Sequence, residues 1–368
     1  MRAAILEAPN TPLVVADDVE HDDPRPGEVL VRVTHCGVCH SDLSVVEGVF
    51  PAMTPVVCGH EPAGVVEAVG SAVTSLVPGD KVVLSCRSTC GRCAFCVRGD
   101  VHFCAHATEL VLSAREDGTT PLSRGGQPVW MGLGLAAFAE YVVTKETGAI
   151  KVADDTPLEL AAVLGCAVQT GTGAALNTAG VGPGATVMVV GLGGVGIAVA
   201  QGARVAGASM IIGVDSMPER REQGKRFGLT HTLDPGAGDV AAAVLELTDG
   251  VGVDFSFEAV GKAALVQTCI DATTNGGTIT AVGVGDLADA VSLPLTMFVM
   301  TGKRLQGCLL GSSNGRRDVP RYLDLWRAGR LDLEGMVTKI RPLEEINEAF
   351  DDMRAGRGLR TVLEIAPG

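Results

Sequence analysis

Apolar residues in the first 85 positions fall into short runs that are separated by turn residues. The runs are Ala3–Leu6, Val29–Val33, Gly64–Val69 and Lys81–Leu84, and Pro-Gly turns stand between them at Pro26 and Pro78. Closely spaced strands with such turns predict a β-rich, barrel-like domain. Residues 86–128 are polar and rich in cysteine, which indicates a long loop that something must hold in place.

The pattern changes near residue 168 to strands that alternate with helices. We predict strands at 186–190, 210–215, 253–257 and 277–284, and helices at 197–208 and 218–228. This alternation is typical of βαβ units and a parallel sheet. From about residue 308 the chain is expected to leave this sheet. A last helix is predicted to start at Pro342, and a last strand at 361–365.

Composition narrows the class of protein. A chain of 368 residues suits two domains, and its 48 glycines with only 4% aromatic residues favour an α/β fold. The net charge of −14 argues against nucleic acid or an anionic membrane as a partner. The chain has no long apolar run and no signal pattern, so we expect a cytoplasmic protein. Its eleven cysteines should then stay reduced and serve metal binding or catalysis.

Four of these cysteines, Cys90, Cys93, Cys96 and Cys104, lie within fifteen residues. Four thiolates at this spacing can surround one tetrahedral ion, and zinc suits them. A site with no open position is structural, and it would hold the long loop. An iron–sulfur cluster and a chance grouping are the alternatives, although no cluster spacing matches well.

A second candidate set combines Cys39 in GVCHSD, His60 in GHEPAG and Cys166 in LGCAVQTG. Two thiolates and an imidazole with one open position are the ligands of a catalytic zinc. The three residues are far apart in the sequence, and a lone histidine beside a glycine is more often a packed or surface residue. Zinc in such a set would lower the pKa of a bound alcohol, as it does for water.

The third candidate is the glycine loop Gly191, Gly193, Gly194, Val195 and Gly196, which follows a predicted strand and opens a predicted helix. Asp215 ends the next strand, 19 residues after Gly196. This context indicates a dinucleotide-binding loop whose helix N-terminus attracts the pyrophosphate. Asp215 would accept hydrogen bonds from the adenosine ribose, which favours NAD. An ordinary glycine turn is the alternative.

Together these motifs resemble the zinc-dependent medium-chain alcohol dehydrogenases, over nearly the whole chain. The resemblance implies a GroES-like β-rich catalytic domain at 1–167 and 309–368, with a doubly wound Rossmann domain at 168–308. The active site would lie in the cleft between them. It also implies reversible hydride transfer between NAD and an alcohol or aldehyde, in a homodimer or homotetramer.

The resemblance assigns further roles to single residues. Cys39, His60 and Cys166 match the catalytic zinc ligands, Glu61 an acid behind the zinc, and Asp42 a partner that orients the ring of His60. Ser41 matches the hydroxyl that takes the alcohol proton. The remaining matches, two near the pyrophosphate and one near the ribose, are His40, Arg360 and Arg220.

Two departures from the family pattern bear on the substrate. Ser44 stands where many members carry a relay histidine, and Thr108 stands where glutathione-dependent members carry an arginine. A formaldehyde dehydrogenase that acts on a thiol adduct, of mycothiol or glutathione, is the alternative enzyme. A non-catalytic zinc-bearing nucleotide-binding protein is the alternative of another class, and the intact ligand triad with Ser41 argues against it.

Overall fold

The computed structural model describes residues 1–366, which divide into two compact units. The first unit holds Met1–Cys166, Asn314–Leu323 and the described residues from Leu333 onward. The second unit holds Ala167–Ser313 and Asp324–Asp332. Helix α11, Gly315–Arg327, runs from the first unit into the second.

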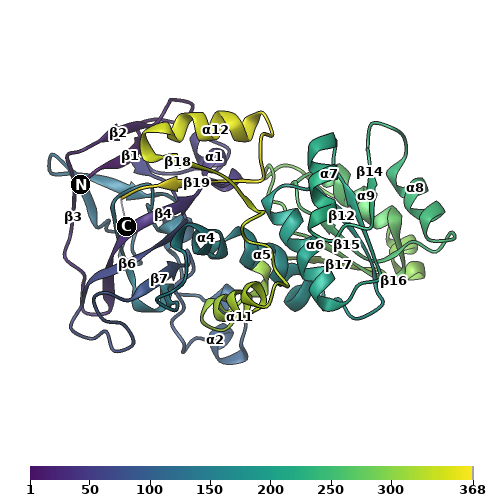
Figure 1. Cartoon of the computed structure of the whole chain (residues 1–368), viewed down its shortest axis with the longest axis horizontal. Helices are drawn as coiled ribbons and strands as arrows, with labels where there is room; N and C mark the ends of the chain where they lie inside the picture. The colour runs from purple at the N-terminus through teal and green to yellow at the C-terminus, as the bar shows by residue number, and fades with distance from the viewer. Residues whose placement is uncertain (367–368) are drawn as a thin grey trace. The chain divides into compact units, whose positions relative to one another are not determined.

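The first unit is rich in strands, as predicted (Figure 1). Its strands are β1 Ala3–Leu6, β2 Val14–Ala16, β3 Val19–His21, β4 Glu28–Gly37, β5 Val56–Val57, β6 Glu61–Val69, β7 Lys81–Leu84, β8 Leu122–Arg124, β9 Gln127–Met131, β10 Tyr141–Lys145, β11 Ala149–Lys151, β18 Val337–Pro342 and β19 Arg360–Glu364. Its short helices are α1 His40–Val46, α2 Ala94–Arg98, α3 Glu109–Leu112, α4 Leu158–Ala161 and α12 Ile346–Arg354, with 3-10 turns at η1 Val101–Phe103, η2 Gly132–Gly134, η3 Glu146–Gly148, η4 Ala162–Gly165 and η7 Leu343–Glu345.

The long strand β4 organises the first unit. It lies inside the sheet ordered β11-β7-β6-β4-β19-β18, and β10 also pairs with it. A second sheet follows the order β2-β1-β5-β9-β8-β3. Most residues of β4 are buried, because their apolar side chains are covered on both faces. The end of β4 is therefore a rigid place from which to present a functional side chain.

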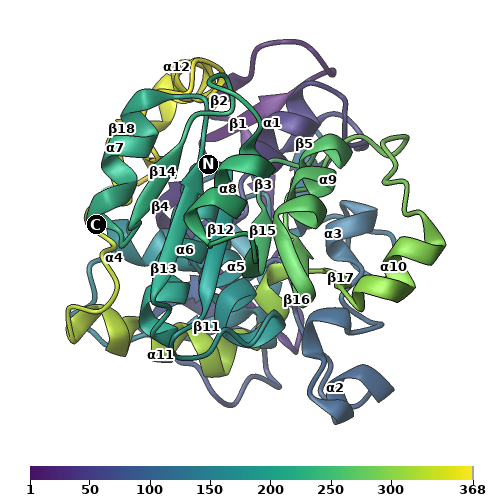
Figure 2. The same cartoon turned by 90° about the vertical axis from the view of Figure 1, so that its right-hand side faces the viewer.

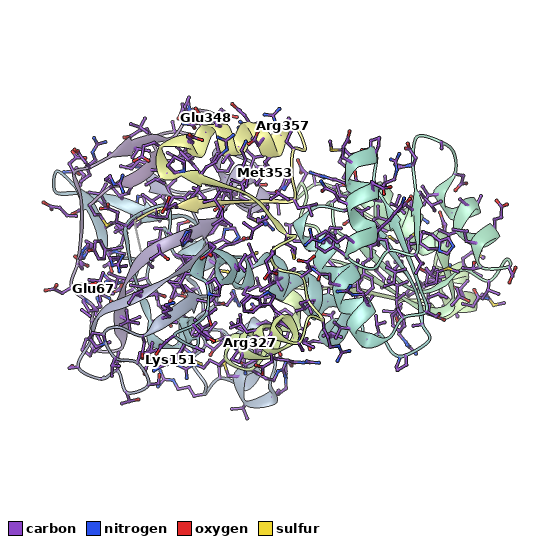
Figure 3. The ribbon with its side chains drawn as sticks, in the orientation of Figure 1. Glu67, Lys151, Arg327, Glu348, Met353 and Arg357 are labelled. Atoms are coloured by element: carbon purple, nitrogen blue, oxygen red, sulfur yellow. The ribbon has the colours of Figure 1, made fainter. Side chains whose placement is uncertain are left out.

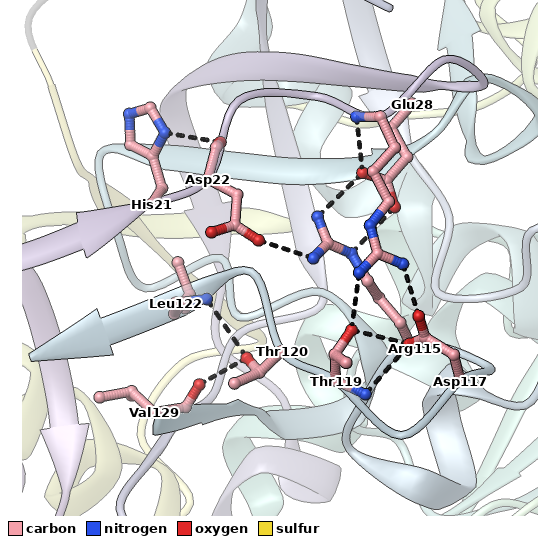
Figure 4. Close-up of polar contacts among 10 residues, drawn as sticks. His21, Asp22, Glu28, Arg115, Asp117, Thr119, Thr120, Leu122 and Val129 are labelled. Carbon is pink, nitrogen blue, oxygen red and sulfur yellow. Dashed lines mark hydrogen bonds and ion pairs between the residues drawn. The ribbon is translucent and has the colours of Figure 1, made fainter. Parts of the chain in front are cut away.

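The cysteine-rich segment contains more regular secondary structure than the predicted loop. It contains α2, α3 and the hairpin β8–β9. Buried Arg115 ties it to the start of β4, because its guanidinium donates two hydrogen bonds to Glu28, of 3.0 and 2.9 Å, and one of 2.8 Å to Asp22 (Figure 4). This bidentate pairing is a strong form of ion pair. Sequence patterning missed these elements because each is short.

The second unit is a parallel sheet with helices on its faces (Figure 2). The strand order is β14-β13-β12-β15-β16-β17. Its strands are β12 Thr186–Val190, β13 Met210–Val214, β14 His231–Leu233, β15 Val253–Glu258, β16 Thr273–Ala281 and β17 Arg304–Gly307. Its helices are α5 Ala167–Gly173, α6 Gly194–Ala206, α7 Pro218–Arg226, α8 Val240–Leu247, α9 Ala263–Ala272 and α10 Leu295–Thr301, with a π-helical turn at η5 Ala174–Thr178 and a 3-10 turn at η6 Leu310–Ser312.

Alternation along the central strands explains this layering. Met188 and Val190 of β12 pack in one apolar cluster with Val244 of α8 and Cys269 of α9. Val189 points the other way, and helix α6 approaches it so closely that a side chain at Gly196 would lie 3.4 Å from it. Because successive strand residues face opposite sides, both faces of the sheet need a helical cover.

The strands predicted for the second unit are confirmed, and two predicted elements have different bounds in the structure. The strand expected at 277–284 runs from Thr273 to Ala281. The helix expected from Pro342 begins at Ile346, since Pro342 ends β18 and pairs with Glu364 of β19. A proline without a neighbouring ladder bond is tolerated in such an edge strand, which sequence patterning read as a helix start.

No single helix in residues 1–366 has the length and apolar character needed to cross a membrane. The consecutive segments Leu158–Gly165 and Ala167–Thr178 reach that composition only together, across a break. Most of their apolar side chains are buried in the protein core.

Asp352 of α12 fixes β18 and the approach to β19. Its carboxylate accepts hydrogen bonds of 2.8 Å from Lys339, 2.7 Å from Arg341 and 2.7 Å from Arg357, which is labelled in Figure 3. These donors hold the pKa of the Asp352 carboxyl well below its usual range, with the Lys339 hydrogen bond as the largest cause. The cluster thereby anchors the strand that carries Arg360.

We predict that Asp352→Asn lowers the free energy of unfolding at pH 7 by about 1–3 kcal/mol, because three cations lose their shared buried carboxylate. The native pKa lies below the unfolded value of about 3.9. The charge therefore stabilises the fold above that value, and the contribution is lost as the pH falls through the native pKa. Urea unfolding at pH 7 and pH 3 should show a smaller deficit in acid. The exposed Asp351→Asn is the control, and an equal deficit at both pH values would contradict the prediction.

Candidate functional site

Three segments of the first unit bring Cys39, His60 and Cys166 together. Cys39 follows β4 and caps α1, His60 directly precedes β6, and Cys166 follows the turn η4. The ligand atoms of these residues and of Glu61 all lie within 4.8 Å of one another. β4 and β6 are antiparallel neighbours, so the end of one and the start of the other meet at the same edge of the sheet.

Glycines directly before two of these residues allow the close approach. A side chain at Gly59 would lie 2.5 Å from the backbone nitrogen of Phe138, and its φ of +93° also disfavours other residues. A side chain at Gly165 would lie 2.8 Å from the carbonyl oxygen of Leu84. Both ligand-bearing turns are thus packed directly against backbone.

Asp42 joins the turns around Cys39 and His60. Its Oδ1 accepts hydrogen bonds from the backbone of Gly59 at 2.9 Å and from Nδ1 of His60 at 3.0 Å. Its Oδ2 accepts one from the backbone of Cys39 at 3.2 Å. With Nδ1 held in this way, Nε2 of His60 is left to bind a metal. The hydroxyl of Ser41 lies 3.9 Å from Sγ of Cys39, and His40 is the exposed first residue of α1.

The electrostatics of this set fit a cation. Cys166 donates a hydrogen bond that lowers the pKa of Cys39 well below its usual value, and the same interaction, with burial, raises that of Cys166. Burial raises the pKa of Glu61 to about 8. Within residues 1–366, neither carboxylate oxygen of Glu61 has a hydrogen-bond partner. Buried acids that cannot all ionise together become compatible once a metal ion supplies positive charge.

Arg360 of β19 lies behind the set and is 5% exposed. Its guanidinium donates a 2.7 Å hydrogen bond to the carbonyl oxygen of Val38 and lies 3.5 Å from Oε1 of Glu61. Burial by itself would lower the pKa of Arg360. The charges of Glu61 and Cys39 outweigh this effect and raise the pKa, so the guanidinium stays charged. Arg360 thus lies beside the group formed by Cys39, His60, Glu61 and Cys166. Its contact with a pyrophosphate stays a prediction.

A second cluster consists of Cys90, Cys93, Cys96 and Cys104, whose sulfur atoms also lie within 4.8 Å of one another. Backbone N–H groups of Arg92 and Cys93 point at Sγ of Cys90, at 3.5 and 3.3 Å. Hydrogen bonds from the backbone lower the pKa of Cys93 to about 6, whereas burial raises that of Cys96 to about 12. A tetrahedral zinc fits four such thiols, because it ionises them all and leaves no open position.

The glycine loop lies in the second unit, between β12 and α6. Gly191 has a φ of +89°, Gly193 caps the helix, and Gly194, Val195 and Gly196 form its first turn. A side chain at Gly196 would lie 1.8 Å from the carbonyl oxygen of Gly191. The loop therefore needs glycine at positions 191 and 196, as a helix N-terminus that receives a pyrophosphate does.

Asp215 is 8% exposed and braces this loop. Its Oδ2 accepts a 2.8 Å hydrogen bond from the backbone of Leu192, and its Oδ1 accepts one of 2.9 Å from Met217. Arg220 of α7 lies 3.8 Å from Oδ2. Each carboxylate oxygen can still accept another hydrogen bond, so the arrangement is compatible with a ribose.

Sequence reasoning missed Gly37, which lies opposite Glu61 in the β4–β6 ladder. A signal was available, since a glycine in a strand often marks a close approach. It also did not foresee that Arg360 and Glu61 lie together, because that contact depends on the pairing of β19 with β4.

Comparison with known proteins agrees with this geometry. Residues 25–154 match the alcohol dehydrogenase GroES-like domain, and residues 194–328 match the zinc-binding dehydrogenase domain. The chain is 38% identical over 367 residues to S-(hydroxymethyl)glutathione dehydrogenase from Escherichia coli, which covers 98% of this chain and 99% of that protein.

Two solved structures are similar along their whole lengths. Benzyl alcohol dehydrogenase from Acinetobacter calcoaceticus is 32% identical, with a TM-score of 0.94 and 99% of each chain covered. An alcohol dehydrogenase zinc-binding domain protein from Burkholderia ambifaria is 36% identical, with a TM-score of 0.95, covering 100% of this chain and 99% of that one.

Fold and site thus define an oxidoreductase that pairs a GroES-like domain with a Rossmann-type domain. The chain belongs to the zinc-dependent medium-chain alcohol dehydrogenase family.

We predict that Asp42→Asn weakens metal binding at Cys39, His60 and Cys166 by about 10- to 100-fold. The three N–H groups that donate to Asp42 use both of its carboxylate oxygens, and an amide offers only one acceptor oxygen. The zinc of the four-cysteine cluster should be retained. Zinc release to a competing chelator measures both sites in one experiment. The exposed Asp18→Asn serves as the control, and release curves that match those of the unaltered protein would refute the role of Asp42.

Proposed function

We propose that this chain interconverts small alcohols and their aldehydes by hydride transfer with NAD, at a zinc held by Cys39, His60 and Cys166. The observation that carries this proposal is the convergence of two thiols and an Asp42-oriented imidazole in one buried place. The glycine loop with Asp215 supports NAD as the hydride carrier. The four-cysteine cluster would hold a second, structural zinc.

The residues of the chain divide the work. A zinc ion held by Cys39, His60 and Cys166 would supply a Lewis acid for the alcohol oxygen, and NAD at the glycine loop would supply the hydride acceptor. Ser41 is positioned to accept the alcohol proton, because its hydroxyl lies beside Cys39. Asp42 holds His60 in one tautomer. Arg360 balances the negative charge of Glu61 and the thiolates from behind.

A thiol-adduct formaldehyde dehydrogenase is the second candidate, because a relative that is 38% identical carries that name. Thr108 in place of an arginine favours the simple alcohol. Three kinds of substrate distinguish the two candidates: benzyl alcohol, ethanol, and formaldehyde mixed with glutathione or mycothiol. The absorbance of NADH measures turnover of each. Activity on the adduct alone would favour the second candidate, and no turnover with any of them would refute both.

We also propose that the chain forms a homodimer or homotetramer and works in the cytoplasm. Four apolar side chains of α10 are 60–76% exposed, which is unusual for a surface that faces water. They are Leu295, Met297, Val299 and Met300. A second copy is the proposed occupant of this face. All eleven cysteines are free thiols, which suits a reducing compartment.

We predict two zinc ions per chain with separable effects. Cys39→Ala should remove one zinc and abolish turnover while it leaves the melting temperature close to that of the unaltered protein. Cys93→Ala should remove the other zinc and mainly lower stability, because the loop loses its cross-link. Metal analysis and thermal melting check both variants. A single zinc per chain, or iron with visible absorbance, would contradict the assignment.

We predict that kcat/KM for NAD exceeds that for NADP by at least about 100-fold, because a 2′-phosphate would approach the carboxylate of Asp215. Arg220, 3.8 Å from that carboxylate, offsets part of the repulsion. Asp215→Gly with Ser216→Arg should narrow or reverse the ratio. Steady-state kinetics with both cofactors provide the measurement. Equal use of the two by the unaltered enzyme would show that Asp215 does not face the ribose.

A further inference from the structure

Gly37 and Glu61 form a cross-strand pair beside the proposed metal site. Gly37 is the last residue of β4, and it lies directly opposite Glu61, the first residue of β6. Side chains of directly opposite residues in an antiparallel ladder lie on the same face. The carboxylate of Glu61 therefore folds over the position where Gly37 has no side chain.

The space beside Gly37 is filled by this carboxylate. A Cβ atom at Gly37 would lie 2.2 Å from Oε2 of Glu61 and 3.0 Å from its Cβ. The φ of Gly37 is not in the left-handed region, so the backbone itself would accept another residue. What excludes a side chain at Gly37 is the side chain of Glu61, and its carboxylate oxygen makes the shortest of these contacts.

The backbone at Gly37 has little freedom to yield. Gly37 pairs with Glu61 on one side and with Val362 of β19 on the other. Cys39 follows only two residues later. A side chain at Gly37 would therefore displace the carboxylate and leave the strand in place. A carboxylate oxygen of Glu61 already lies within 4.8 Å of the ligand atoms of Cys39, His60 and Cys166, so the proposed metal position is directly beside it.

We propose that Gly37 is a positioning residue that keeps Glu61 out of the metal coordination shell. Because Gly37 has no side chain, the carboxylate of Glu61 can occupy the space beside it. The fourth metal position then stays open for the substrate oxygen. Zinc with three protein ligands is open to substrate, whereas zinc with four is closed. This inference rests on the proposed metal role of Cys39, His60 and Cys166.

The test uses the full chain with cobalt in the proposed catalytic site and imidazole as a probe of the open position. Gly37→Ala should shift the visible cobalt spectrum and weaken imidazole binding at least 10-fold, because a carboxylate oxygen competes for the position. It should also lower kcat/KM. The double variant Gly37→Ala with Glu61→Asp should recover imidazole binding, since the shorter acid leaves room for the new methyl group. Gly27→Ala is the matched control, because nothing lies within 4 Å of a Cβ there and its φ is ordinary.

Thermal melting of the metal-free variants tests the packing separately. Gly37→Ala should melt at a lower temperature than the unaltered protein. Adding Glu61→Asp to Gly37→Ala should restore most of the lost melting temperature. If Gly37→Ala does not fold, the double variant must fold for the proposal to stand. Unchanged imidazole binding in Gly37→Ala, or no recovery in the double variant, overturns it. Failure of the unaltered chain to take cobalt at Cys39 would instead refute the proposed function, and the melting cycle would still report on Gly37 and Glu61.

Discussion

The proposed catalytic site depends on one electrostatic constraint, which is that acidic groups are buried together with too few cations. Cys39, Cys166 and Glu61 are at most 8% exposed, and Arg360 is the arginine that lies against them. Burial raises the pKa of Cys166 and Glu61, so the metal-free site holds protons that it gives up when a cation arrives.

The fold meets this constraint by fixing most of these groups from neighbouring strands, while Cys166 follows the turn η4. β4 delivers Cys39, β6 begins with Glu61 just after His60, and β19 carries Arg360. These three strands are consecutive neighbours in one sheet, so the positions of the groups follow from the two hydrogen-bonded ladders on either side of β4. The Asp352 cluster matters here because it secures β18, which pairs with β19.

The sequence predicts local features well and distant contacts poorly. The four cysteines of the second cluster lie within fifteen residues, so their spacing alone indicates a common ion. The strand, glycine turn and helix around Gly191 are likewise contiguous, and the structure has them where they were predicted. The grouping of Cys39, His60 and Cys166 needed the family resemblance, because it depends on strand pairing. Gly37 and the Arg360–Glu61 contact were missed for the same reason, and the short helices α2 and α3 because periodicity needs longer segments.

This difference between local and distant ligands has a physical consequence for the two metal sites. The segment from Cys90 to Cys104 has only the short elements α2 and η1, so a zinc bound by its four cysteines would cross-link it. The other site is built on a sheet that already fixes its ligands, and Gly59 and Gly165 press its turns against neighbouring backbone. A metal at Cys39 therefore adds little to the fold and can keep one position open. The space beside Gly37 also helps to keep a metal position open. An open position requires that the carboxylate of Glu61, which is the nearest one, occupy a place away from the metal.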